Sequence, residues 1–161
     1  MTKAEGVQGR REVRYETMQD IANDLDELAA GGEPRSLGNW TAAQNVEHVA
    51  KFFEFAREGY PDIGFPTPLR WFIGTFAKKR YLARGFQPGF KFPTKKVAAA
   101  FGPGDMTWAE AVSYFREQIE RSRQPGVMTS VNPILGKMTH EEYVQLQCRH
   151  AELHFSFLVP A

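Results

Sequence analysis

Apolar residues recur every three or four positions near the start of the chain, which is typical of one face of an amphipathic helix. The pattern predicts a helix from about residue 15 to residue 29, and its core-facing positions are Tyr15, Met18, Ile21, Ala22, Leu25, Leu28 and Ala29. Gly31 and Gly32 follow the last of these positions, and Pro34 comes two residues later. Because glycine and proline favour helix ends, the helix is expected to end there.

Three later helices are predicted from the capping-box pattern, in which a threonine is followed three residues later by Gln or Glu. The pattern occurs at Thr41–Gln44, Thr107–Glu110 and Thr139–Glu142, each ahead of a helical spacing of apolar residues. The expected helices span residues 41–58, 107–123 and 139–158. Four amphipathic helices and no predicted sheet indicate an all-α fold, a four-helix bundle with a long crossover between the second and third helices.

The crossover, residues 60–105, differs in composition from the helices because it contains six of the ten prolines. A short helix is predicted after Pro68, ending in the basic run Lys78-Lys79-Arg80, and residues 85–93 are expected to be irregular. Phe90-Lys91-Phe92 alternates like a strand that Pro93 interrupts. Residues 69–84 combine aromatic and basic side chains, as interfacial helices do. The alternative is that the aromatic residues cap the bundle and the basic residues are solvated.

The length of 161 residues favours one domain, predicted to span 14–161 after a loose, polar tail at 1–13. A net charge of +1 disfavours a dedicated nucleic-acid binder, because no overall basic field exists. The single cysteine, Cys148, cannot form an intrachain disulfide. The first fourteen residues lack the apolar region of a signal peptide, and no apolar run approaches the ~18 residues of a membrane span. These features favour a cytoplasmic protein.

Three of the four histidines occupy positions that suggest a metal site. His150 and His154 lie four residues apart on the apolar stripe of the last helix, so their imidazoles are stacked on successive turns and can converge on one ion. His48 lies at the flank of the second helix, where it could supply a third ligand. The alternative is that these are core histidines whose hydrogen bonds are satisfied within the protein. His140, in the first turn of the last helix, is expected at the surface.

Other catalytic patterns are absent from the sequence. Cys148 lies off the stripe of His150, which disfavours a Cys-His pair, and Glu152 lies on the opposite face, so no general-base carboxylate accompanies the two histidines. The sequence contains no GxSxG motif and no glycine-rich phosphate loop. The pair Glu141-Glu142 is explained by capping and by the helix dipole. The catalytic residues therefore stay unknown at this point.

Two segments resemble the DinB-like metalloprotein superfamily. "WTAAQNVEHVAKF" (Trp40–Phe52) is similar to the start of its second helix, and "NPILGKMTHEEYVQLQCRHAELHFSFL" (Asn132–Leu158) is similar to one branch of this superfamily. The resemblance covers about residues 14–158. The chain departs from that branch after the last histidine, because Phe155, Ser156 and Phe157 stand where the branch carries a further histidine and then glutamine.

The resemblance implies a four-helix bundle that binds a divalent ion through His48, His150 and His154, with other coordination positions left open. Zinc is the first expectation and nickel the alternative. Characterised relatives include thiol-dependent transferases and isomerases, so we expect a metal-dependent enzyme acting on a small molecule, of the thiol S-transferase or hydrolase type, with a low-molecular-weight thiol as co-substrate. Two other functions stay open: a non-catalytic bundle with a structural or vestigial site, and a peripheral membrane or partner-binding module. A homodimer is compatible with the sequence. A small-molecule substrate is favoured over a membrane as the partner.

Overall fold

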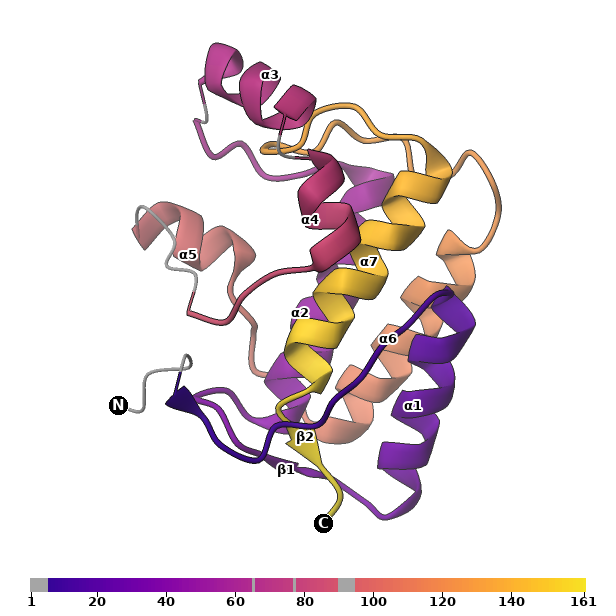
Figure 1. Ribbon diagram of the computed structural model, residues 1–161. Helices are drawn as coiled ribbons and strands as arrows, with labels where there is room; N and C mark the ends of the chain where they lie inside the picture. The colour runs from indigo at the N-terminus through magenta and orange to yellow at the C-terminus, as the bar shows by residue number, and fades with distance from the viewer. Residues whose placement is uncertain (1–5, 65, 77, 90–94) are drawn as a thin grey trace.

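The structure of the protein, a computed structural model, describes residues 6–64, 66–76, 78–89 and 95–161. These residues are mostly helical. In chain order the elements are α1 (Met18–Ala30), β1 (Arg35–Ser36), α2 (Ala42–Glu58), α3 (Thr67–Phe76), α4 (Lys78–Arg84), α5 (Lys95–Phe101), α6 (Trp108–Ser122), α7 (His140–Phe155) and β2 (Leu158–Val159). The four longest helices, α1, α2, α6 and α7, pack together, while α3, α4 and α5 lie outside them (Figure 1). In the described residues no helix is both long enough and apolar enough to cross a membrane.

Each of the four long helices begins with a capping box headed by a threonine. The three predicted from sequence, at Thr41, Thr107 and Thr139, are confirmed. A fourth heads α1, where the Thr17 hydroxyl accepts from the Asp20 amide while the Asp20 carboxylate accepts from the Thr17 amide at 2.8 Å. Hydrogen bonds from the Thr17 and Glu16 backbone amides lower the pKa of Asp20. The helix therefore begins at Met18, later than the apolar pattern indicated.

The apolar stripes of the four long helices meet in one core. Ile21, Leu25, Phe53, Phe115 and Phe155 are completely buried, and each comes from a position that faces the other helices. Burying side chains of this size stabilises the fold by roughly 1.5–3 kcal/mol each. The core is thus assembled by the periodicity that the sequence shows.

The expectation that the chain contains no sheet is wrong in one place. The last helix was expected to reach residue 158, but α7 ends at Phe155, and Leu158 and Val159 form β2. This strand pairs antiparallel with β1, with Ser36 opposite Leu158. The Ser156 hydroxyl donates to the Leu153 carbonyl at 2.7 Å, which satisfies a carbonyl of the last helical turn.

The segment expected as a loose tail is in contact with the bundle from Arg10 onward. The Arg10 guanidinium donates to the Ser156 hydroxyl and lies 4.4 Å from the centre of the Phe157 ring. The Arg11 amide donates to the Ser156 carbonyl at 2.8 Å, and the Arg11 side chain pairs with Asp24 of α1. Residues 10–11 thus join the end of α7 to α1. Residues 1–5 lie outside the described residues.

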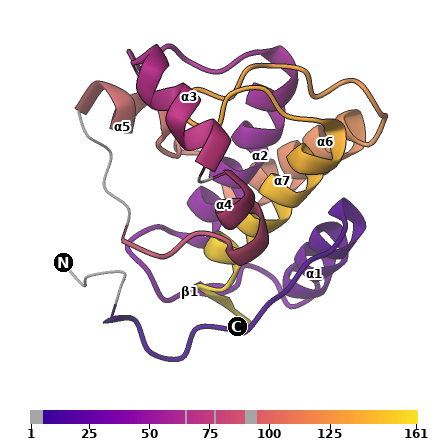
Figure 2. The same cartoon turned by 45° about the horizontal axis from the view of Figure 1, so that its top comes forward.

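The crossover is more helical than the sequence indicated. The helix expected after Pro68 is present as α3, but it begins at Thr67 and ends at Phe76, before the basic run in which it was expected to end. The basic run belongs to α4, which packs on α7. The helix α5 was not predicted. The strand-like Phe90-Lys91-Phe92 lies outside the described residues. Figure 2 shows α4 in front of α7, the helix on which it packs.

Candidate metal centre

The structure brings together the three histidines that were singled out from the sequence. His48 comes from α2 and His150 and His154 from α7, two helices that pack against each other. One ring nitrogen from each of the three lies within 4.8 Å of the others. The Nε2 atoms of His48 and His150 are 3.1 Å apart, and the rings of His48 and His154 are 4.5 Å apart. His140 does not belong to this group.

Aromatic rings surround the histidine cluster. The Trp40 indole stacks on His154, with ring centres 5.3 Å apart and planes within 7°. The Phe52 ring lies 4.3 Å from His150 and 4.8 Å from His48, measured between ring centres. Side chains of this kind fix the imidazole rotamers by packing and keep the surroundings poor in water. Trp40 and Phe52 both belong to the segment that carried the family resemblance.

Asn45 orients one of the three imidazoles. Its Oδ1 lies 3.1 Å from His154 Nδ1, and its Nδ2 donates to the Thr41 carbonyl at 2.9 Å. Because the amide group donates to Thr41, its oxygen is the atom that faces His154 and accepts the Nδ1 proton. The lone pair of His154 is then on Nε2, the nitrogen available to an ion. Sequence reasoning missed Asn45, although its place one turn before His48 was a usable signal.

Replacing Asn45 by alanine is expected to lower the affinity for a divalent ion about 10- to 100-fold, because His154 loses the partner that fixes its tautomer. Asn45→Asp, which keeps an acceptor at this position, should retain most of the affinity. Competition against a zinc-binding dye measures both variants. Asn23→Ala, at an exposed position of α1, is the control. Equal affinities of Asn45→Ala and the parent would contradict a positioning role for this amide.

Burial keeps all three imidazoles neutral. It lowers the pKa of His48 to about 3, although a backbone hydrogen bond with Phe101 acts in the opposite direction. Burial also lowers the pKa values of His150 and His154 well below the ordinary range, and the neighbouring histidines add to the effect. Neutral imidazole is the form that binds a metal ion. The lowered pKa values therefore favour the protonation state that a metal site requires.

No carboxylate in the described part of the chain joins the three nitrogens. Glu47 is buried next to His48 in sequence, but it pairs with Lys51 at 2.8 Å and accepts from the Met106 amide at 3.4 Å. Glu47 thus anchors the segment that leads into α6 to α2. The donor set of the cluster consists of three uncharged nitrogens.

These residues could hold a divalent metal ion. Tetrahedral coordination with metal–nitrogen distances of ~2.1 Å places ligand nitrogens about 3.4 Å apart. The ring nitrogens of His48 and His150 are already near this separation, and the group as a whole, which lies within 4.8 Å, would have to come closer together around an ion. His150 Nδ1 is buried, with no hydrogen-bond partner among the described residues, so the cluster is incompletely satisfied by the protein alone.

The sequence matches the family described as "Protein of unknown function (DUF1569)" over residues 7–161. The chain belongs to this family. The match spans both helices that carry the histidines, so the cluster lies within the DUF1569 domain. No curated protein and no solved structure matched the chain when it was compared with them.

The single thiol of this DUF1569 protein is separate from the histidine cluster. Cys148 is completely buried in the helix core. Burial raises the pKa of this thiol to about 12, with further increases from nearby carboxylates. A thiol in this state is a poor nucleophile and a poor ligand at neutral pH. Cys148 therefore acts as an apolar core residue.

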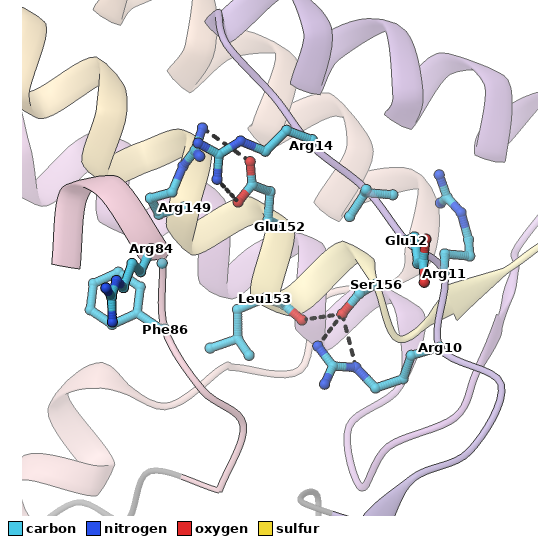
Figure 3. Close-up of a pocket in the computed structure, with 12 residues that line it drawn as sticks. Arg10, Arg11, Glu12, Arg14, Arg84, Phe86, Arg149, Glu152, Leu153 and Ser156 are labelled. Carbon is cyan, nitrogen blue, oxygen red and sulfur yellow. Dashed lines mark hydrogen bonds and ion pairs between the residues drawn. The ribbon is translucent and has the colours of Figure 1, made fainter. Parts of the chain in front are cut away.

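Glu152 has a role that the sequence did not indicate. On the other side of α7 from α2 lies a cavity of about 370 Å³, lined by residues 10–14, α4, Phe86 and α7, and none of the three histidines lines it. Glu152 accepts from the Tyr15 amide at 2.8 Å and pairs with Arg149 at 3.1 Å and Arg14 at 3.6 Å (Figure 3). It thereby ties the N-terminal segment to α7. The expectation that Glu152 lies on the face of the last helix opposite the histidines holds, and the structure adds that this face is covered by the N-terminal segment.

Glu152→Ala is expected to destabilise the fold by about 3 kcal/mol, because it leaves the buried Arg149 guanidinium, which is 2% exposed, without its carboxylate. Urea unfolding followed by circular dichroism measures the change. Glu16→Ala is the matched control: Glu16 also pairs with Arg14, but at the surface, so its loss should cost less than about 1 kcal/mol. Equal stabilities of the two variants would contradict this role.

Proposed function

We propose that the DUF1569 protein binds one divalent metal ion per chain through His48, His150 and His154. The observation that carries the proposal is the convergence of three neutral imidazole nitrogens from two helices within 4.8 Å of one another. Zinc suits an all-nitrogen set of this kind, and nickel is the alternative. The fold is then of the DinB-like type, as the resemblance of the two histidine-bearing segments implies.

We further propose that the protein is a metal-dependent enzyme acting on a small molecule, of the thiol S-transferase or hydrolase type. Three protein ligands leave coordination positions open, as in catalytic rather than structural sites. A divalent ion held in this way supplies a Lewis acid that favours the deprotonated form of a thiol or of water near neutral pH. The protein's own residues hold the three nitrogens, fix the His154 tautomer through Asn45, and exclude water with Trp40 and Phe52.

A second candidate is a non-catalytic bundle in which the ion has a structural role. Two observations favour it: the cluster lacks a carboxylate in the described residues, and the cavity beside α7 does not include the histidines. In this case the ion joins α2 to α7, and removal of the ion lowers the thermal stability without affecting any turnover.

Metal analysis and an activity assay on the same preparation separate the two candidates. The protein is purified without a nickel column, its metal content is measured, and it is assayed with zinc or nickel against electrophilic model substrates in the presence of glutathione or another low-molecular-weight thiol. Metal-dependent turnover supports the enzyme, and bound metal without turnover on any thiol or ester supports the structural site. A protein that binds neither ion contradicts both.

A further inference from the structure

Helix α3 presents a row of large apolar side chains to solvent. Leu69, Trp71, Phe72 and Phe76 are 45%, 66%, 56% and 65% exposed, and no residue of this ten-residue helix is buried. At 100° per residue these four positions fall within one continuous arc of the helix. Their rings contact one another: Phe76 lies 4.9 Å from Phe72 and 6.4 Å from Trp71 between ring centres. The alternative prediction, that the aromatic residues of 69–84 cap the bundle, is therefore wrong for those of α3.

The opposite side of α3 is fixed against the protein. A side chain at Gly74 would approach the Leu135 carbonyl oxygen to 2.7 Å, so the helix backbone lies directly on the turn formed by residues 132–136. Ile73, on the same side, packs on the core. The apolar arc consequently points away from the bundle. Figure 1 shows α3 at the end of the molecule opposite the two strands and the C-terminus.

The stretch of sequence that contains α3 is strongly basic. Residues 60–104 contain eight Lys or Arg and a single acidic residue, Asp62, whereas the rest of the chain has twelve basic and eighteen acidic residues. Lys79, Arg80 and Arg84 of α4, which follows α3, are exposed. Lys78 is already paired with Glu142 at 2.8 Å. An apolar arc thus lies beside positive charge of α4 that has no ion-pair partner among the residues the structure describes, and the rest of the sequence carries a net negative charge.

We propose that α3 and the exposed face of α4 form a docking surface for an anionic lipid membrane. Exposed Trp and Phe next to Lys and Arg is the composition of helices that lie in a membrane interface, where the rings enter the headgroup region and the cations meet acidic lipids. The negative remainder of the chain is repelled by the same lipids, so it orients the protein with α3 toward the surface. This surface is separate from the histidine cluster and does not depend on the proposed metal.

A second copy of the chain is the less favourable occupant of this face. Pairing α3 with itself would bring two segments of the same strong positive charge together, and like charges in contact oppose association. An acidic bilayer removes that repulsion and covers the same apolar side chains. Charge complementarity therefore selects the lipid surface.

Sedimentation with vesicles tests the proposal on the whole protein. We expect binding to vesicles of phosphatidylcholine with phosphatidylserine, and much weaker binding to phosphatidylcholine alone, with no effect of a metal chelator. Trp71 should report the contact by a shift of its fluorescence to shorter wavelength, since Trp40 is stacked on His154 and Trp108 is half-buried. Because each basic residue near such a surface contributes ~1 kcal/mol, the double variant Lys79→Glu, Arg80→Glu should lower the partition coefficient about tenfold or more.

The double variant Trp71→Ser, Phe72→Ser should abolish binding and the fluorescence shift, while circular dichroism stays unchanged because both side chains are exposed. The control pair Arg35→Glu, Arg121→Glu makes the same change of net charge elsewhere and should bind like the parent. Failure to bind acidic vesicles, or equal binding to both kinds of vesicle, overturns the proposal. A mass that doubles with concentration and is halved by the Trp71, Phe72 variant would assign the face to self-association instead, and would also overturn it.

Discussion

His150→Ala is expected to lose the bound ion, with less than about a tenth of the parent's metal content, while the protein stays a folded helical bundle. The substitution removes one of the three proposed ligands, whose Nε2 lies 3.1 Å from His48 Nε2. The cavity left by the substitution lowers the free energy of unfolding by about 1–3 kcal/mol. Because native domains typically have a free energy of unfolding of ~5–15 kcal/mol, the bundle should stay folded. Any turnover should disappear together with the metal.

Metal analysis, circular dichroism and the thiol-dependent assay are applied together to this variant, and His154→Ala should behave in the same way. His140→Ala is the control, because it removes the same side chain from the same helix outside the cluster. Full activity in His150→Ala would refute a metal-dependent enzyme at this site. An unfolded His150→Ala would favour the structural role of the ion.

Acidification below about pH 6.5 is expected to destabilise the protein steeply. The pKa of His48 is about 3 in the folded state and ~6.5 in the unfolded state. Above pH 6.5 this histidine is neutral in both states, so its contribution to the stability is at its full value. Below that pH the unfolded chain binds a proton that the folded chain does not, and the free energy of unfolding falls by about 1.4 kcal/mol per pH unit for this histidine. His150 and His154 are shifted in the same direction and add to the loss.

Urea unfolding at pH 7.5, 6 and 5 measures this dependence, and the midpoint should move to lower urea at each step. His48→Gln serves as the control, since its stability should fall less steeply with pH. The same protonation releases a bound ion, because imidazolium cannot bind a metal, so dialysis against a chelator at low pH should strip the site. A stability that is constant between pH 7.5 and pH 5 would contradict burial of the three neutral imidazoles.

The four long helices could be predicted because their signals are local. Each threonine cap and each apolar stripe lies within a short stretch of sequence, and the pair His150 and His154 follows from helical spacing alone. The helix position of His48 indicated only that it could supply a third ligand, and the family resemblance then joined it to the other two, since its approach to His150 depends on how α2 packs against α7. The strands β1 and β2 are two residues long and pair across a long sequence separation, so no periodic pattern of apolar residues predicts them.

The contacts of single polar side chains were the hardest to foresee. Asn45 and Glu152 both sit on predicted helices, yet their partners, His154 and the Tyr15 amide, lie more than a hundred residues away in sequence. In the crossover, the helical spacing after Pro68 indicated α3, but spacing does not say which side of a helix the protein covers. That became visible only in the contact between Gly74 and the Leu135 carbonyl.

The burial of Cys148 has a consequence for the protein's response to oxidants. With a pKa of about 12, only ~1 in 10⁵ of these thiols is deprotonated at pH 7, and the core shields that fraction from reagents. Oxidation to a sulfenic acid requires an accessible thiolate, so this sulfur is spared. The cysteine of this chain therefore supplies no reactive thiolate, and any thiolate that reacts at the histidine cluster must arrive with another molecule.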